Sequence, residues 1–127
     1  MAFVMNNNNP HNLLVEDCVI RAISTITNKT WDDIYLELMI EGFFEKNYPN
    51  FNIIWWSYLT KNGFKRHLVP DSCPLCYTLK DFVIEHPIGS YIVGDGNHVV
   101  AVIDGDYIDT WDSGNMTILF YFTKEEM

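Results

Sequence analysis

The chain has 127 residues, 48% of them hydrophobic and 15% aromatic, which suits one domain with a hydrophobic core. Its formal net charge is −9, and an acidic surface repels phosphate backbones and anionic bilayers. Nucleic-acid and membrane partners are therefore not expected. No apolar run approaches the roughly 20 residues that cross a bilayer, and no opening segment resembles a signal peptide. Three cysteines are too few for a disulfide framework, so we expect a soluble cytoplasmic protein in a reducing compartment.

The first half of the chain predicts an arm and three helices. Residues 1–12 contain four consecutive Asn before Pro10 and predict a flexible N-terminal arm, and residues 13–127 predict a single domain. The helices are identified by a capping residue, an apolar pattern and an end signal. They are expected at Cys18–Thr27 after the N-cap Asp17, from a Thr30 cap to Gly42, and from Asn50 or Phe51 to Lys61.

The second half predicts strands and one short helix. Thr78 is expected to cap a helix that ends at His86, before Pro87. Strands are expected where apolar runs lie between Gly and Asp turns: Phe64–Val69, Tyr91–Val93, His98–Ile103, Tyr107–Trp111 and Met116–Phe122. Helices followed by antiparallel strands predict an α+β domain, with the helices packed on a C-terminal sheet.

Cys18 is the candidate nucleophile because it opens the first predicted helix. The free N–H groups and peptide dipoles of a helix N-terminus favour the thiolate, which is the reactive form of cysteine. The competing interpretation is a buried structural cysteine that packs beside Ala22, and position alone does not choose between the two.

His98 is the candidate base among the four histidines. It opens an apolar strand after the Gly-rich turn at residues 94–97, where a side chain is exposed. The others have ordinary explanations, since His86 ends a helix, His67 lies in a probable strand and His11 lies in the arm. The alternative interpretation is that His98 lies at the edge of a strand and has no functional role.

Asp112 is the preferred carboxylate to orient His98, and Asp109 is the second choice. A hairpin turn at residues 104–106 brings the end of one strand back beside the start of the other. With a three-residue loop, His98 faces Asp112, and with a two-residue loop it faces a neighbour of Asp112. The alternative role for Asp112 is to cap the turn that it makes with Ser113.

An oxyanion formed by thiol attack needs hydrogen-bond donors. The backbone N–H of Cys18 is one candidate, and the side chain of Asn12, six residues earlier, is a weaker one.

Two segments together resemble the papain-like cysteine peptidase superfamily, in particular small bacterial and phage proteins of that type. They are Asp17-Cys18-Val19-Ile20-Arg21-Ala22 and the stretch from His98 to Gly114, which includes Asp109-Thr110-Trp111-Asp112-Ser113-Gly114. The resemblance implies a papain-like fold with Cys18 as nucleophile, His98 as base and Asp112 as the orienting residue. Because the chain is short for a peptidase, its cleft is expected to be shallow or completed by a partner.

A pair of cysteines and several aromatic residues also allow more than one interpretation. Cys73 and Cys76 have metal-ligand spacing, but no second such pair exists, so ordinary loop cysteines are favoured over a zinc site or a disulfide. Trp55, Trp56 and Tyr58 at helical spacing predict core positions. Trp111, next to Asp112, is expected to shield the His–Asp contact from water.

The resulting functional expectation is a cysteine peptidase or amidase that acts on a peptide or protein substrate and needs no metal or organic cofactor. It would lie in the host cytoplasm if a phage encodes it. The main alternative is a non-catalytic interaction protein of the same fold, and a third possibility is a metal site formed by Cys18, His98 and Asp112. The sequence leaves the oligomeric state open.

Overall fold

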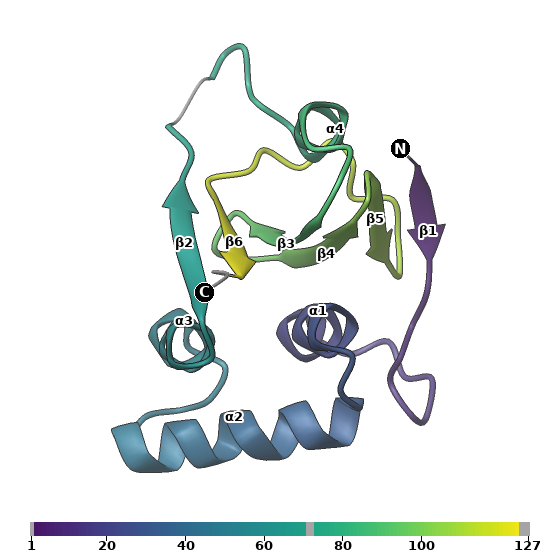
Figure 1. Cartoon of the computed structure of the whole chain (residues 1–127). Coiled ribbons are helices and arrows are strands. Elements are labelled where there is room, and N and C mark those ends of the chain that lie inside the picture. Colours follow the sequence, from purple (N-terminus) through teal and green to yellow (C-terminus); the bar gives the residue numbers. More distant parts are fainter. Residues whose placement is uncertain (1, 71–72, 125–127) are drawn as a thin grey trace.

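The computed structural model describes residues 2–70 and 73–124 and has an α+β fold with helices on both faces of one sheet (Figure 1). The six strands have the spatial order β1-β5-β4-β3-β6-β2, and every neighbouring pair is antiparallel except β1 and β5. The elements in chain order are β1 (Phe3–Met5), α1 (Cys18–Thr27), α2 (Trp31–Glu45), α3 (Asn52–Lys61), β2 (Phe64–Leu68), α4 (Leu79–Glu85), β3 (Ser90–Gly94), β4 (Val99–Ile103), β5 (Asp106–Asp109) and β6 (Phe120–Lys124).

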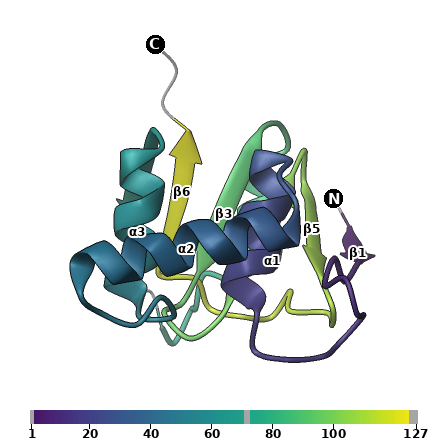
Figure 2. The same ribbon diagram turned by 90° about the horizontal axis from the view of Figure 1, so that it is seen from below.

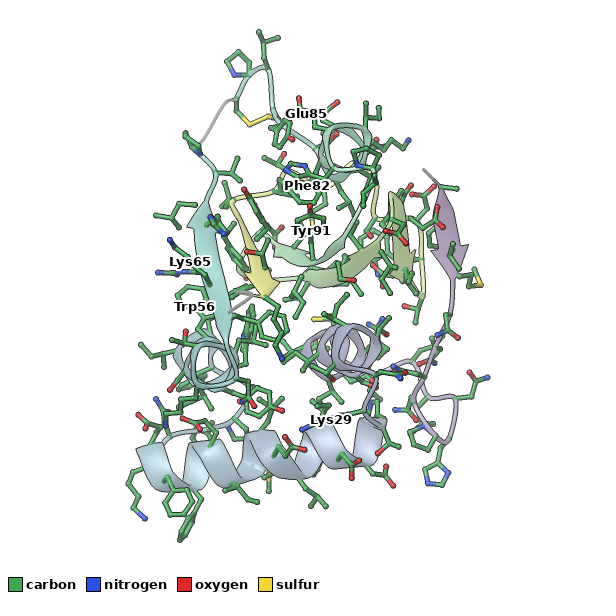
Figure 3. The ribbon with its side chains drawn as sticks, in the orientation of Figure 1. Lys29, Trp56, Lys65, Phe82, Glu85 and Tyr91 are labelled. Carbon is green, nitrogen blue, oxygen red and sulfur yellow. A yellow bond between two sulfur atoms is a disulfide. The ribbon has the colours of Figure 1, made fainter. Side chains whose placement is uncertain are left out.

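Strand β4 separates two hydrophobic cores, because successive side chains of a strand point to opposite faces. Val99 and Ala101 pack in the core that contains residues of α1, α2 and α3. Val100 and Val102 pack in the core beneath α4, together with Phe82. Figure 3 shows Phe82 and Tyr91 between α4 and the sheet, where their rings meet edge to face. A strand buried on both faces explains the continuous apolar run of β4.

Several helix signals of the sequence are confirmed. Helix α1 covers the predicted range, and Trp55 and Tyr58 of α3 are buried in the core. The Thr30 hydroxyl accepts a hydrogen bond from the backbone N–H of Asp33 at 3.0 Å and so caps α2. Thr78 forms a capping box with Asp81 at the start of α4.

The expected end of α2 at Gly42 was wrong, because the helix continues to Glu45. Gly42 is buried inside the helix, and a Cβ atom there would lie 2.7 Å from the backbone oxygen of Asn47. The chain folds back against the helix at this point, so a glycine is required by close approach. Lys46, in the left-handed conformation at φ 60°, ends the helix instead.

The N-terminal arm is packed more closely than the sequence indicated. Residues 3–5 form β1, which runs parallel to β5 and pairs Met5 with Asp109. Asn9 is buried at 7% exposure. An edge strand of three residues has little apolar pattern of its own, so the alternation of side chains could not predict it.

Within residues 2–70 and 73–124, no helix is long and apolar enough to cross a bilayer.

Candidate active site

Three segments meet at one end of the sheet. Helix α1 packs on β4, and its first residue is Cys18. Strands β4 and β5 are antiparallel neighbours, so the start of β4 lies beside the end of β5. His98 immediately precedes β4, and Asp109 is the last residue of β5. The fold therefore brings a thiol, an imidazole and a carboxylate together from positions far apart in the chain.

His98 neighbours both other groups. Its Nε2 lies 2.7 Å from Oδ2 of Asp109, and its ring lies beside the Cys18 side chain on the wall of the same cleft. Burial by itself lowers the pKa of His98, but the hydrogen bonds and charges of Asp109 and Cys18 raise it to about 9. The imidazole is consequently protonated at neutral pH, and it forms a buried ion pair with the carboxylate.

Asp112, the preferred orienting carboxylate, does not contact His98, and that choice is corrected to Asp109. Strand β5 ends at Asp109 instead of Trp111, so the chain leaves the hairpin before it reaches Asp112. The Asp112 carboxylate accepts hydrogen bonds from the Tyr107 hydroxyl and the backbone N–H of Gly114. It therefore stabilises the turn, which was the alternative role considered for it.

The Asp109 carboxylate is held on both of its oxygens. Oδ2 accepts a hydrogen bond from the Ser113 hydroxyl at 2.7 Å in addition to the contact with His98. Oδ1 accepts from the backbone N–H of Thr110 at 2.8 Å and from Arg21 at 3.1 Å. Burial alone raises the pKa of Asp109, but His98, then Ser113 and the backbone N–H of Thr110, hold it below the usual value. The carboxylate is thus ionised and fixed in orientation.

Arg21 connects this carboxylate to the N-terminus of α1. Its Nε donates to Oδ1 of Asp17 at 2.8 Å, while Nη1 reaches Asp109. The other Asp17 oxygen accepts hydrogen bonds from Trp31 Nε1 at 2.9 Å and Asn9 Nδ2 at 3.2 Å. This network was not among the features predicted from the sequence. The available signal was that Arg21 is the one charged residue of an otherwise apolar or neutral helix, four residues after Asp17.

The Cys18 side chain is partly buried and is not in a disulfide. The first N–H groups of a helix lack intrahelical partners, and Asp17 makes no side-chain hydrogen bond to this end of the helix. These N–H groups, including that of Cys18, are the donors available for an oxyanion. Asn12 is exposed and does not line the cleft at Cys18, so the structure does not bring the weaker oxyanion candidate to the site.

A cleft of about 1020 Å³ opens over Cys18 and His98. Trp111 forms part of its wall, and its ring centroid lies 5.0 Å from that of His98. This neighbour relationship agrees with the expected position of Trp111, although the indole remains 52% exposed. The cleft wall also includes large exposed apolar side chains, namely Leu13, Leu14, Val15, Tyr35 and Met39.

Cys73 and Cys76 form a disulfide, which corrects the preferred interpretation of two ordinary loop thiols. Their sulfur atoms are bonded to each other and are not thiolate ligands, so the zinc alternative is not supported at these residues. Among the described residues, no group of three or more His, Cys, Asp or Glu side chains is arranged to hold a metal ion. The Asp112 carboxylate binds Tyr107 and Gly114 instead of Cys18 or His98. The structure therefore does not support a metal site formed by Cys18, His98 and Asp112.

Comparisons with protein-family models, with curated proteins and with solved structures found no match to this chain.

Proposed function

We propose that this protein is a cysteine hydrolase of papain-like type, with Cys18 as nucleophile, His98 as general acid and base, and Asp109 as the orienting residue. The observation that carries the proposal is that His98 lies 2.7 Å from the Asp109 carboxylate and lines the same cleft as the Cys18 thiol. A partly buried histidine that neighbours both a carboxylate and a thiol is an arrangement that activates a cysteine nucleophile.

The proposed reaction begins with the Cys18 thiolate paired with the His98 imidazolium. The sulfur attacks an amide or isopeptide carbonyl carbon and forms a C–S bond, while the carbonyl oxygen takes the negative charge. Backbone N–H groups at the start of α1 stabilise that charge. As the C–N bond breaks, the imidazolium gives its proton to the leaving amine, and a thioester on Cys18 remains.

Hydrolysis of the thioester restores the enzyme. Neutral His98 takes a proton from a water molecule, whose oxygen attacks the thioester carbonyl. The C–S bond then breaks, the acid product leaves, and the thiolate is again paired with the imidazolium. An amine in place of water would give acyl transfer. Each step uses the side chains and backbone of the chain itself, without a cofactor.

Substrates of this site are proposed to be peptide or protein segments. The cleft is open and has exposed apolar side chains on its wall, which suit an extended chain with apolar residues. Arg21 and His98 are the basic residues of the cleft wall, and both are already paired with carboxylates. The cleft therefore offers no unpaired cation to bind an anionic substrate.

A non-catalytic interaction protein is the second candidate function. This function is favoured by the exposed apolar side chains of α2, because contiguous exposed apolar surface of this kind marks a protein interface. The two candidates differ in the reactivity of Cys18, since a binding protein needs no activated thiol.

Alkylation with iodoacetamide tests the proposal directly. Cys18 is the one cysteine outside the disulfide, so without reductant the intact mass reports a single adduct. We expect fast labelling at pH 6 that slows at least tenfold in His98→Ala and is unchanged in the control His11→Ala, an exposed loop histidine. Slow labelling with the pH profile of an ordinary thiol, equal in wild type and His98→Ala, would reject the catalytic assignment.

A further inference from the structure

Helix α2 is apolar on two opposite sides. Its buried side faces the core through Ile34, Leu38 and Gly42. Six large apolar side chains lie on the remaining surface, with exposures between 42% for Tyr35 and 69% for Phe44. They form two rows with a spacing of four residues: Tyr35, Met39, Phe43 and Leu36, Ile40, Phe44. We call this surface the α2 stripe.

Nothing in the described chain covers the α2 stripe. Figures 1 and 2 show α2 on the side of α1 and α3 that is turned away from the sheet, at the surface of the molecule. A surface helix normally has one apolar face, turned to the core, and a second contiguous apolar face exposed to solvent marks an interface. The stripe is therefore a surface that needs a partner.

Two opposite charges beside the stripe, Asp32 and Lys46, lie at equal distances from Met39 in the sequence. Asp32 lies seven residues before Met39, and the exposed Lys46 lies seven residues after it. Tyr35 and Phe43 are each four residues from Met39. If a second α2 lies antiparallel with Met39 against Met39, Tyr35 faces Phe43 and Asp32 faces Lys46 at both ends. A surface that complements itself in this way is what a two-fold dimer requires.

Glu37 and Glu41, in the middle of α2, are turned away from the stripe. Glu37 accepts hydrogen bonds from Tyr58 and Lys29, and Figure 3 shows Lys29 between α1 and α2. Glu41 accepts from Lys61 and Ser57 of α3. Their carboxylates are thus engaged on the α3 side and do not face a second copy. Repulsion between the two acidic chains is screened beyond about 8 Å at physiological ionic strength.

We propose that two copies of this chain pair through the α2 stripe, with the two α2 helices antiparallel and centred on Met39. Rows of side chains four residues apart form the ridges and grooves by which helices pack. Tyr35 and Met39 also line the cleft over Cys18, so the second copy would lie at the edge of that cleft and extend its wall. This inference goes beyond the proposed function and does not depend on the chemistry of Cys18.

Sedimentation velocity of the full chain tests the proposal at physiological ionic strength, from low micromolar to several hundred micromolar protein. The 14.8 kDa chain is expected to shift from monomer to dimer with concentration. Ile40→Asp places a charge inside the stripe and should remain monomeric. Ile84→Asp, at a similarly exposed position on α4, should dimerise like wild type. Circular dichroism verifies that each variant is folded.

A charge exchange tests the antiparallel arrangement. Asp32→Lys and Lys46→Asp should each weaken the dimer several-fold, and the double variant should restore it. The two positions are about 20 Å apart along one helix, so they can compensate only between copies. A wild-type chain that is monomeric at every concentration would overturn the proposal, as would a dimer unaffected by Ile40→Asp. Failure of the double variant to recover would overturn the antiparallel pairing.

Discussion

Arg21 and Asp109 form a buried ion pair, with Nη1 of the guanidinium 3.1 Å from Oδ1 of the carboxylate. Arg21 belongs to the helix that begins with Cys18, and Asp109 ends the strand beside His98. The pair therefore fixes the distance between the element that carries the thiol and the element that orients the base. The stability of the fold and the geometry of the site depend on the same contact.

Replacement of Arg21 by Met should strongly destabilise the protein. The variant leaves Asp17 buried without a cation and Asp109 with His98 alone, and loss of one partner of a buried pair costs about 3–5 kcal/mol. Urea unfolding followed by tryptophan fluorescence measures the free energy of unfolding. Lys61→Met, which removes an exposed partner of Glu41, is the control and should have only a small effect. Equal losses in the two variants would contradict the role given to Arg21.

Asp109 and Asp112 should differ sharply in their effect on Cys18. Asp109→Asn removes the charge next to His98 and should slow iodoacetamide labelling at pH 6–7 about 100-fold or more, because the imidazolium is no longer stabilised. Asp112→Asn leaves the His98 contact intact and should change the rate less than about twofold. The ratio of the two rate constants is the measurement. A larger effect of Asp112→Asn would restore Asp112 as the orienting residue.

The raised pKa of His98 predicts how stability changes with pH. The folded pKa of about 9 lies above the unfolded value of about 6.5. The folded state thus holds the proton more tightly, and this contribution is fully present below about pH 6.5. It is lost as pH rises through 9. The unfolding free energy of wild type minus that of His98→Gln should therefore shrink from pH 6 to pH 10. NMR titration of His98 gives the pKa directly, and a midpoint below 7 would contradict the prediction.

Trp111 should influence His98 through water exclusion. The two rings are neighbours, and Trp111→Ala would expose the His98–Asp109 contact to solvent. Hydration weakens the ion pair of His98 with Asp109, so labelling of Cys18 at pH 6 should slow several-fold and the pKa of His98 should change. Trp111→Phe keeps an aromatic ring at this position and should retain most of the wild-type behaviour. An unchanged pKa of His98 in Trp111→Ala would reject a shielding role.

Capping residues and apolar periodicity predicted most of the helices, because each of these signals depends only on residues that are close together in the sequence. The Thr30 and Thr78 caps act within one turn, and the apolar face of α1 repeats within ten residues. Gly42 shows the limit of such signals. A glycine that ends a helix and a glycine that allows close approach of another segment look the same in the sequence, and only the position of Asn47 distinguishes them.

Local signals of this kind also predicted two residues of the candidate site. Cys18 and His98 were identified from a helix start and a strand start, and the structure brings both residues to the wall of one cleft. The choice between Asp109 and Asp112 required the register of β4 and β5. Ile103 pairs with Asp106, so the turn has two residues, Asp104 and Gly105. Strand β5 ends at Asp109, so the hairpin carries Asp109 back beside the start of β4, and Asp112 lies beyond the end of the strand.

The sequence by itself determined the α+β class, the extent of α1 and the two residues that open α1 and precede β4, since short-range capping and periodicity specify these features. Only the tertiary structure decided that β1 joins β5, that Arg21 links Asp17 to Asp109, and that Asp109 holds His98. These relationships join residues up to 104 positions apart, as in the hydrogen bond from Ala2 to Asp106. Such contacts depend on strand order, register and side-chain reach, which no local pattern encodes.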